Sequence, residues 1–388
     1  MPVLQRKNIL ILSPQNWGRM FVSKHHYAIE LARLGNKVFF LDPPEQGASD
    51  LGSSIEIKPL PDVENLFLIR HKLWFPYVLK FHAMPVFHLG MGWHLKKLLR
   101  AIGEPIDIIW SFDLGNLYPF KFFGDVGCRV FHPVDEPLIP QAIESARGAD
   151  VIFSVTTEIL EKYKKFGIPS HFINHGVSEN FLVQAPFDGA GGGEVRIGFS
   201  GNLLRSDLDR DTFLQIVREN PDIRFECWGS YKDGHSNIGG SADSETQKFM
   251  ENLLAFHNVT LHGPVPSEKL ALEIRRMDGF LICYDIQKDQ SKGTNYHKVM
   301  EYISTGKVII SNNVTTYRQQ PDLVQMVESR EDNHQLPALF RKVTGDLAYH
   351  NSPDLQARRI AFARDNSYGR QLERIEAILG KINSNKRS

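Results

Sequence analysis

Short, almost fully apolar runs recur along the chain and are separated by segments with the periodicity of amphipathic helices. The first two runs, at 8–12 and 38–41, flank a helix-forming stretch at 24–34 that ends at Gly35. Apolar strands that alternate with helices form parallel sheets whose two faces are both covered. The chain is therefore expected to fold in the α/β class.

The same alternation continues through both halves of the sequence. Further strands are predicted at 66–69, 106–110, 129–132, 151–155, 171–173, 195–200, 224–228, 259–261, 279–284 and 308–311. Because 388 residues exceed one ordinary hydrophobic core, we expect two doubly wound, Rossmann-like domains that face each other across a cleft. A last helix is predicted from Ser367 to about Leu379.

A glycine-rich run, DGAGGGE at 188–194, marks the expected boundary between the domains, because such a run does not persist inside a helix or strand. We expect four parts. They are an N-terminal domain over 1–185, a linker over 186–194, a C-terminal domain over 195–360, and a terminal helix and tail over 361–388.

Composition narrows the possible functions. The formal net charge is zero, with 45 basic and 45 acidic residues, which argues against a nucleic-acid partner. The three cysteines form no CxxC pair, so neither a disulfide framework nor a cysteine zinc site is expected, and a reducing, cytoplasmic location is favoured. No export signal or membrane-spanning run is predicted. The absence of GxGxxG and of a P-loop motif disfavours dinucleotide oxidoreductases and P-loop enzymes.

The most informative stretch is GTNYHKVMEYISTGKVIIS, at 293–311. A helix is predicted from Tyr296 to Thr305 with Asn295 as its N-cap. Lys298 falls in the first turn, where the helix dipole disfavours a cation, and it precedes Glu301 in the weaker order for a helical ion pair. Both choices are explained if a diphosphate binds at the helix start to Lys298 while Glu301 accepts hydrogen bonds from ribose hydroxyls. An ordinary exposed Lys/Glu pair is the alternative.

The segment HKVMEYISTGKVII resembles the donor-binding motif of glycosyltransferase family 4, whose members have the GT-B fold. The resemblance implies that Lys298 contacts the donor phosphates and Glu301 the ribose, and that the terminal helices cross back onto the first domain. IGFSGNLL at 197–204 and the stretch 258–285 are also similar to the family, and GADVIFSVTTEIL and INHGVS in the first half match it more weakly. They add Gly201, Asn202, Gly263 and Val265 as donor-binding candidates. The remaining candidates are Gly293 and Thr294, at the start of the stretch 293–311.

The resemblance implies transfer of a sugar, most simply a hexose, from a nucleoside-diphosphate sugar to a saccharide or lipid-linked acceptor, without a cofactor. Many members of the family carry a glutamate where this chain has Gly293, so the contacts to the donor sugar must differ. Two alternatives remain open. One is a GT-B type epimerase acting on the nucleotide sugar, and the other is a non-catalytic nucleotide-sugar-binding protein.

Further candidates surround this site. Arg205 is either a second cation for the diphosphate or a solvent-facing residue, and the aspartates at 207, 209 and 211 are expected to cap a helix, so no metal site is predicted. Asp135 and, less favoured, Asp113 follow predicted strands and are candidates for the acceptor-activating base, with loop capping as the alternative. His25 and Gly18 are expected near the crevice of the first domain, although a structural role for His25 is the simpler interpretation.

Residues 65–103 contain no Asp or Glu but carry six Lys or Arg residues among many aromatic ones. Basic and aromatic residues together suit a segment that lies on an anionic membrane surface. A core-packing helical insertion with a solvated basic face is the alternative.

Overall fold

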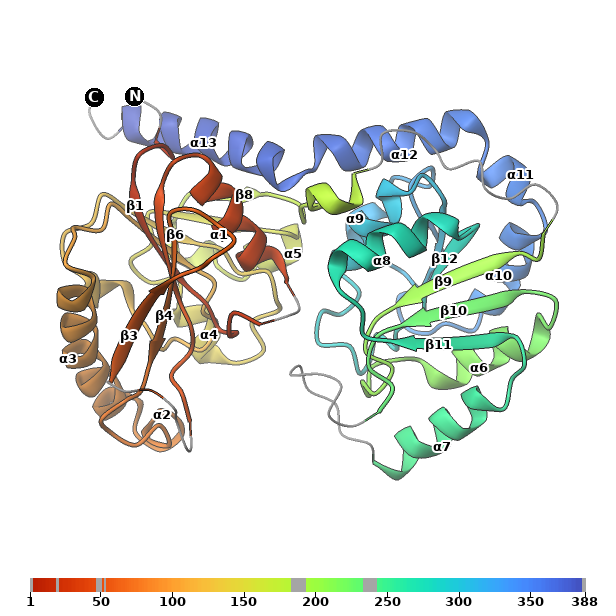
Figure 1. The fold of residues 1–388 in the computed structure, drawn as a ribbon, viewed down its shortest axis with the longest axis horizontal. Helices are drawn as coiled ribbons and strands as arrows, with labels where there is room; N and C mark the ends of the chain where they lie inside the picture. The colour runs from red at the N-terminus through yellow and green to blue at the C-terminus, as the bar shows by residue number, and fades with distance from the viewer. Residues whose placement is uncertain are drawn as a thin grey trace. The chain divides into compact units, whose positions relative to one another are not determined.

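The computed structural model describes residues 3–18, 21–46, 51, 54–182, 193–232 and 243–385 of the chain. It divides into two compact units, Met1–Asn174 with Tyr368–Ser388, and His175–Ser367. Each unit contains one sheet with helices around it (Figure 1). The prediction of two doubly wound α/β domains is confirmed.

The sheet of the first unit has eight strands in the order β3-β4-β2-β1-β5-β6-β7-β8. All neighbours run parallel except β3 and β4, which are antiparallel. The strands are β1 Asn8–Leu12, β2 Lys37–Leu41, β3 Ile55–Pro59, β4 Leu66–His71, β5 Ile108–Ser111, β6 Cys128–Phe131, β7 Val151–Ser154 and β8 Ser170–Phe172. β3 was not predicted, because its polar residues and partial exposure at the sheet edge hide the apolar pattern of a buried strand.

The central strand β1 shows how this sheet is covered on both faces. Leu10 and Leu12 pack in one core with residues of α3 (Met84–Ile102), whereas Ile9 and Ile11 pack in a second core on the other face. That second core contains residues of α1 (Ser23–Arg33) and of the C-terminal helix α13 (Tyr368–Asn385). Alternate residues of one strand point to opposite faces, so a continuous apolar run needs helices on both.

Helix α13 belongs to the first unit although it follows the second in sequence, as expected for the terminal helix. The carboxylate of Glu376 accepts a hydrogen bond of 2.7 Å from the backbone N–H of Leu4 and another from that of Val3. The ring of Tyr368 stacks on His26 of α1 with 4.7 Å between centroids. The shorter helices of this unit are α2 Leu79–His82, α4 Pro140–Glu144 and α5 Thr157–Glu161.

The sheet of the second unit has six strands in the order β11-β10-β9-β12-β13-β14, and all neighbours are parallel. The strands are β9 Arg196–Ser200, β10 Arg224–Trp228, β11 Val259–Gly263, β12 Gly279–Ile282, β13 Val308–Ser311 and β14 Gln325–Met326. The helices are α6 Arg210–Glu219, α7 Ser244–Leu254, α8 Ser267–Glu273, α9 His297–Ser304, α10 Leu336–Thr344, α11 Leu347–His350 and α12 Pro353–Asp365. The two-residue β14 is too short to be seen in a sequence pattern.

The division between the units differs from the expected linker. Of residues 186–194, only Gly193 and Glu194 are among those that the structure describes. The first unit ends earlier, at Asn174, because the backbone N–H of Val177 already donates to the carbonyl of Asn366 at 3.0 Å within the second unit. The terminal segment expected at 361–388 is also divided, since α12 belongs to the second unit and only the part from Tyr368 to the first.

The segment noted for its basic and aromatic residues packs into the core of the first unit. Residues 65–103 form β4, α2 and α3, and Phe87, Met91 and Leu95 of α3 are buried in the core, as the core-packing alternative requires. The three cysteines are buried, and none of them forms a disulfide in the part of the chain that the structure describes. None of the helices in the described ranges combines the length and apolar content that crossing a bilayer requires.

Candidate functional site

The second unit has its topological switch point between β9 and β12. In the sheet order β11-β10-β9-β12-β13-β14, the strand that follows β9 in sequence is its neighbour on one side, β10. The strand that follows β12 in sequence, β13, lies on the opposite side. The loops after these two strands therefore separate, and ligands of doubly wound sheets bind in the crevice that this opens at the carboxyl ends of the strands.

The ammonium group of Lys298 lies at this point. Its Nζ donates to the carbonyl oxygen of Ser200, at the end of β9, and to the hydroxyl of Tyr284, just after β12, each at 2.5 Å. It also lies 5.0 Å and 4.9 Å from the ring centroids of Phe199 and Tyr284. The side chain thus bridges the ends of β9 and β12, the two strands at the switch point.

The surroundings of Lys298 make a further anion favourable. Its pKa is lowered by burial, which means that the site carries too little negative charge to compensate for the desolvated ammonium. Helix α9 begins directly before it, with Tyr296 as N-cap, no side-chain cap and no acidic residue in the first turn. The expected cap, Asn295, is therefore one residue too early. A cation beside a helix start without a side-chain cap is the arrangement with which proteins commonly bind anions such as phosphate.

Tyr302 fixes α9 against the end of β9. Its hydroxyl accepts a 2.6 Å hydrogen bond from the backbone N–H of Ser200 and lies 2.9 Å from the Ser200 hydroxyl. Its ring stacks on Phe280 of β12 with 4.1 Å between centroids. Because Tyr302 is one turn beyond Lys298 on the same helix, this contact holds the ammonium in register with the crevice.

Three glycines allow the turns after β9, β10 and β11 to touch. The N–H of Gly201 donates to Trp228 O at 2.8 Å, and that of Gly229 donates to Gly263 O at 2.9 Å. A Cβ at Gly229, where φ is +125°, would lie 2.0 Å from Gly201 O, and a Cβ at Gly201 would lie 2.5 Å from Lys298 Nζ. Only glycine permits this approach of backbone to backbone and to the ammonium.

Arg205 and Asn202 follow the Gly201 turn. Asn202 braces it, since its Oδ1 accepts from the N–H of Leu204 at 2.9 Å. Arg205 is close enough to Lys298 to lower the pKa of the ammonium further, but its Nε donates at 2.8 Å to the buried carboxylate of Asp207, which raises the pKa of the guanidinium. Arg205 therefore adds positive potential at Lys298, while Asp207 already accepts part of the hydrogen bonds that its guanidinium can donate. Asp209 caps α6 by accepting from the N–H of Thr212 at 3.1 Å.

The loop from 285 to 296 is organised by the buried carboxylate of Asp289. This carboxylate accepts from the N–H of Gly293 at 2.9 Å and from the Tyr296 hydroxyl at 2.8 Å. Gly293 has φ +65°, and a Cβ there would lie 2.7 Å from Asn313 O, so a side chain such as that of glutamate does not fit this loop conformation. Thr294 is buried, and its hydroxyl donates to Ser291 O at 2.8 Å, which gives it a structural role in the loop.

Glu301 lies one turn after Lys298 and is mostly buried. Its carboxylate is 3.4 Å from Nδ1 of His297, four residues earlier on α9. The ring of His297 in turn makes an edge contact with His175, with 5.5 Å between centroids. Within the described residues no ion pair joins Glu301 to Lys298, so the pair is not a simple helical salt bridge.

On the other side of the switch point, the half-buried Val265 follows β11 and packs against the core. Nearby, the rings of Trp228 and His262 stack with 4.9 Å between centroids, and His262 Nε2 lies 2.6 Å from the Glu226 carboxylate. Gly263, with φ +73°, ends the strand between these groups. The ends of β10 and β11 thus carry planar and polar groups.

The motif identified Lys298 and Glu301, but it did not identify Tyr284 or Asp289. Both act through the side chains they position. Nothing in the local sequence sets Tyr284 apart from other residues that follow a strand. A signal for Asp289 was present, since an acidic residue shortly before a glycine is typical of a side-chain-capped turn.

No protein-family model and no curated protein sequence matches the chain. Solved structures do match it. Sucrose-phosphate synthase from Thermosynechococcus elongatus has a TM-score of 0.71 at 12% identity, with 98% of this chain and 99% of that chain covered. Trehalose 6-phosphate synthase from Burkholderia multivorans has a TM-score of 0.67 at 14% identity, with 99% and 98% covered. HepE of Anabaena, in complex with UDP and glucose, has a TM-score of 0.64 at 12% identity, with 96% and 99% covered.

The chain has the GT-B fold. This confirms the fold that the donor-binding motif had implied.

In the first unit of this GT-B fold, Asp135 and Asp113 have different environments. Asp113 is buried, and its carboxylate accepts from the N–H groups of Gly115 at 2.7 Å and Leu117 at 2.6 Å, so it caps its own loop. Burial raises its pKa. Asp135 is exposed and is near Lys24, a lysine of α1 whose pKa is lowered by burial and which Asp135 stabilises in its charged form. Lys24 was missed by the sequence analysis.

His25 braces the loop that follows β1 in the GT-B fold's first unit. Its Nδ1 accepts from the N–H of Val22 at 3.1 Å, and its Nε2 lies 3.2 Å from Asn16 O. Burial lowers its pKa to about 4, so the ring is neutral near pH 7. Gly18 is half-buried at the end of the same loop. Both ring nitrogens of His25 are thus used by backbone groups.

Proposed function

We propose that the chain is a glycosyltransferase that moves a sugar, most simply a hexose, from a nucleoside-diphosphate sugar to a saccharide or lipid-linked acceptor. The observation that carries the proposal is the ammonium of Lys298 at the switch point of the second unit, beside an uncapped helix start. A diphosphate supplies the negative charge that this place lacks, and the strand ends around it can receive a nucleoside.

In this proposal the second unit binds the donor. Lys298 and the first N–H groups of α9 bind the diphosphate, which passes close to the Gly201–Asn202 turn because no Cβ obstructs it. Glu301, one turn further on, accepts hydrogen bonds from the ribose hydroxyls, and the strand end at Gly263 and Val265 borders the base. The loop at Gly293 and Thr294, held by Asp289, borders the donor sugar.

The chemical step breaks the bond between the anomeric carbon and the diphosphate oxygen and forms a bond to an acceptor oxygen. Negative charge grows on the leaving diphosphate, and the Lys298 ammonium, with the positive potential of Arg205, stabilises it. Asp135 is the group that takes the acceptor proton, because it is exposed whereas Asp113 is committed to its loop. Lys24 then positions Asp135, and the loop of Gly18 and His25 borders the acceptor.

Solved structures of the same fold support the proposal. They include two sugar-phosphate synthases, HepE in complex with UDP-glucose, and the lipopolysaccharide galactosyltransferase WaaB. Each of these is at most 14% identical to this chain, so the proposal depends on the residues of its own site.

The test begins with a thermal-shift panel of nucleoside diphosphates and their sugars. One nucleotide at 100 times its Kd should stabilise the fold by about 2.7 kcal/mol. The best donor is then incubated with and without saccharide and lipid-linked acceptors, and the products are separated. Sugar transfer only when an acceptor is present supports the proposal. An epimerised donor without acceptor identifies an epimerase, binding without product identifies a binding protein, and no stabilisation by any nucleotide overturns the proposal.

A further inference from the structure

Helix α3 of the first unit is apolar on two sides. One side carries Phe87, Met91, Leu95 and Leu98, all fully buried in the core against the sheet. A second side carries Val86, Leu89 and Trp93, which are exposed. Their spacing of three and then four residues places them in one stripe along the helix. Only the first stripe is explained by the fold.

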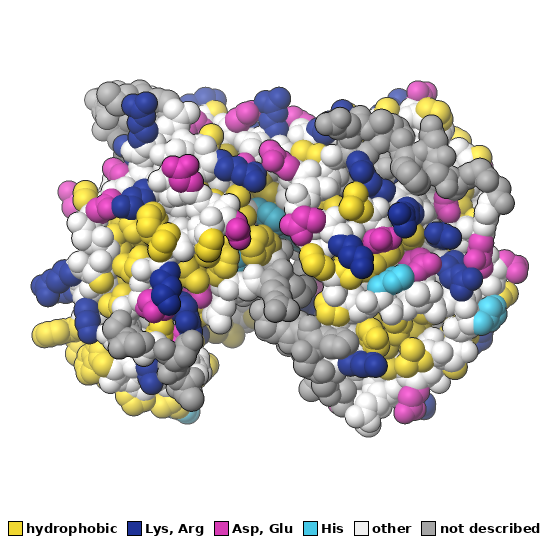
Figure 2. Space-filling model, in the orientation of Figure 1, with side chains coloured by type: hydrophobic (Ala, Val, Ile, Leu, Met, Phe, Trp, Pro, Cys, Tyr) yellow, Lys and Arg dark blue, Asp and Glu magenta, His cyan; other side chains and the backbone are white. Residues whose placement is uncertain are grey.

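The segment before α3 extends the exposed apolar area. Trp74, Val78 and Phe81 precede the helix, and all three are exposed. Trp74 and Trp93 are 68% and 69% exposed, and Phe81 and Leu89 are 69% and 67% exposed. Figure 2 shows hydrophobic side chains gathered at the edge of this unit where Figure 1 draws α2 and α3. Large apolar side chains exposed together, rather than singly, mark an interaction surface.

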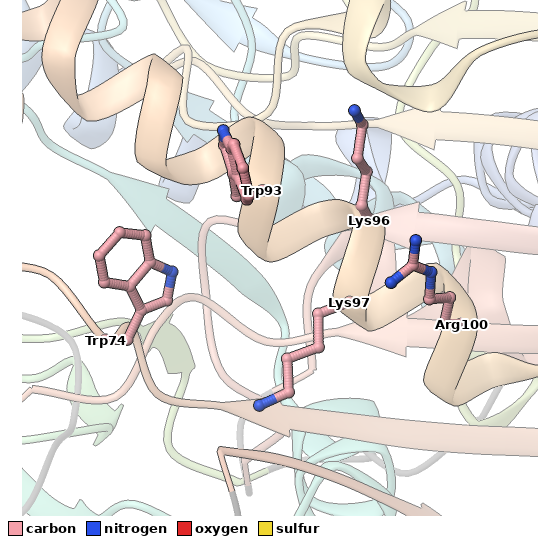
Figure 3. Close-up of a pocket in the computed structure, with 5 residues that line it drawn as sticks. All are labelled: Trp74, Trp93, Lys96, Lys97 and Arg100. Atoms are coloured by element: carbon pink, nitrogen blue, oxygen red, sulfur yellow. The ribbon is translucent and has the colours of Figure 1, made fainter.

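Basic side chains continue the same stripe. Lys96 and Arg100 follow Trp93 at the next helical steps, and Lys97 is beside them. With Trp74 and Trp93 they line a hollow of about 590 Å³, in which four side chains come from α3 and Trp74 from the segment before it (Figure 3). Among the described residues, neither Lys96 nor Arg100 takes part in an ion pair, and 65–103 contains no acidic residue.

We infer that this surface, defined as Trp74, Val78, Phe81, Val86, Leu89, Trp93, Lys96, Lys97 and Arg100 and called the α3 surface, docks on an anionic lipid bilayer. Tryptophan rings favour the interface between water and hydrocarbon, and lysine and arginine beside them bind anionic headgroups. The α3 surface presents both kinds of side chain, and within the described ranges its basic residues form no ion pair with a carboxylate. A protein partner would be expected to match basic residues with acids and to need a polar rim around the apolar residues, whereas a bilayer needs neither.

The inference is independent of the proposed function, because docking needs neither donor nor acceptor. If both hold, docking would bring the first unit to acceptors embedded in the same membrane. A failure of either can be recognised separately, since vesicle binding is measured without nucleotide and nucleotide binding without vesicles.

The experiment is flotation of the full chain with vesicles of phosphatidylcholine alone or with 30% phosphatidylglycerol. We expect binding to the anionic vesicles, at least about tenfold weaker binding to the neutral ones, and loss of binding at high salt. Brominated acyl chains should quench fluorescence, because Trp74 and Trp93 are the most exposed tryptophans of the described residues, while Trp110 and Trp228 are buried.

Two double variants separate the contributions. Trp74→Ser with Trp93→Ser removes the aromatic anchors, and Lys96→Glu with Arg100→Glu reverses the charge. Each should weaken binding at least about tenfold, since each basic residue near an anionic surface contributes about a fivefold factor. Thermal melting and nucleotide binding should stay near those of the parent chain, because all four side chains are exposed.

The matched controls are Leu254→Ser with Tyr349→Ser, and Lys248→Glu with Lys269→Glu, which alter equally exposed residues of the second unit. They should leave vesicle binding unchanged. Equal or negligible binding to both vesicle types would overturn the inference, as would controls that reduce binding as much as the α3 variants do. Tryptophan fluorescence that responds to a soluble sulfated polysaccharide and not to vesicles would assign the surface to an anionic saccharide instead.

Discussion

The Nζ atom of Lys298 lies 2.5 Å from the carbonyl oxygen of Ser200, the last residue of β9. This contact joins the start of α9 to the first strand of the second unit, across the switch point of its sheet. A carbonyl oxygen carries only a partial charge, so the ammonium remains largely uncompensated, in agreement with its lowered pKa. The function proposed for the chain depends on this charge.

The lowered pKa of Lys298 predicts that nucleotide affinity depends on pH. As pH rises, the ammonium of the free protein loses its proton earlier than an ordinary lysine does, and the affinity for a diphosphate falls. At lower pH the group is charged and affinity is constant, once protonation of the phosphate is taken into account. Isothermal titration calorimetry from pH 7 to 10 checks this. Lys298→Ala should bind weakly with a flat profile, and an equally flat profile in the parent chain would contradict the prediction.

Alanine substitutions at Gly201 and Gly229 should affect different properties. The first should weaken nucleotide binding, and the second should lower stability. Gly201→Ala would place a Cβ 2.5 Å from Lys298 Nζ, the end of a flexible side chain, so the ammonium moves and the fold survives. We expect about tenfold weaker nucleotide binding with little change in melting temperature. Gly229→Ala would place a Cβ 2.0 Å from the backbone oxygen of Gly201 at φ +125°, which should cost more than about 3 kcal/mol of stability. Calorimetry and thermal melting of both variants decide whether this contrast holds.

Asparagine at the two candidate bases should separate chemistry from structure. Asp135→Asn should lower kcat about 100-fold or more while donor affinity stays the same, and the melting temperature should fall only slightly, because an exposed carboxylate near Lys24 is lost. Asp113→Asn should lower the melting temperature more, because an amide keeps only part of the hydrogen bonding that the buried carboxylate accepts from Gly115 and Leu117. Steady-state kinetics at saturating acceptor and thermal melting distinguish the two. Unchanged turnover in Asp135→Asn would remove this residue from the mechanism.

Buried histidines predict acid sensitivity in the first unit. Burial lowers the pKa of His25 to about 4 and of His132 to about 3, below the ordinary value of 6.5 that they regain on unfolding. The free energy of unfolding is therefore highest above pH 6.5. It decreases as pH falls toward the folded-state pKa values of the two histidines, because the unfolded chain then binds more protons than the folded one. The free energy of unfolding should fall by about 1.4 kcal/mol per pH unit for each such histidine.

The variant His132→Phe tests this directly. It keeps the stacking on Phe112, whose ring centroid lies 5.0 Å away, and loses only a 3.3 Å hydrogen bond from Trp110. The slope of its unfolding free energy against pH should be smaller than that of the parent chain by about 1.4 kcal/mol per pH unit, because one histidine fewer takes up a proton on unfolding. Denaturant unfolding from pH 4 to 8 provides the comparison. Parallel pH profiles would show that His132 does not titrate on unfolding.

The fold could be predicted because buried parallel strands leave a continuous apolar signal, as at β1 and β13. The edge strand β3 left no such signal, because its residues are only partly buried and pair with one neighbour. The unit boundary was displaced because the early contact of Val177 with Asn366 joins residues that are far apart in the sequence.

Prediction of the site had similar limits. Lys298 and Glu301 were proposed because their order contradicts what an isolated helix prefers and because their segment resembles a donor-binding motif. Two sets of hydrogen bonds could not be predicted, because both depend on the conformation of a loop. Arg205 donates to Asp207, and His25 accepts from the backbone of its own loop. The exposed stripe of α3 lay within the segment noted for its basic and aromatic residues, but only the structure separates it from the buried stripe of the same helix.

The most direct measurement compares nucleotide affinity in Lys298→Ala and Glu301→Ala with that in Lys248→Ala and Glu251→Ala, an exposed pair with the same spacing on α7. Calorimetry would use the nucleoside diphosphate that stabilises the chain most, and inorganic pyrophosphate. Lys298→Ala should weaken both ligands about 10- to 100-fold, and Glu301→Ala should weaken only the nucleotide, while the α7 variants change neither. Undiminished affinity for every nucleotide in the Lys298→Ala, Glu301→Ala double variant would contradict the account.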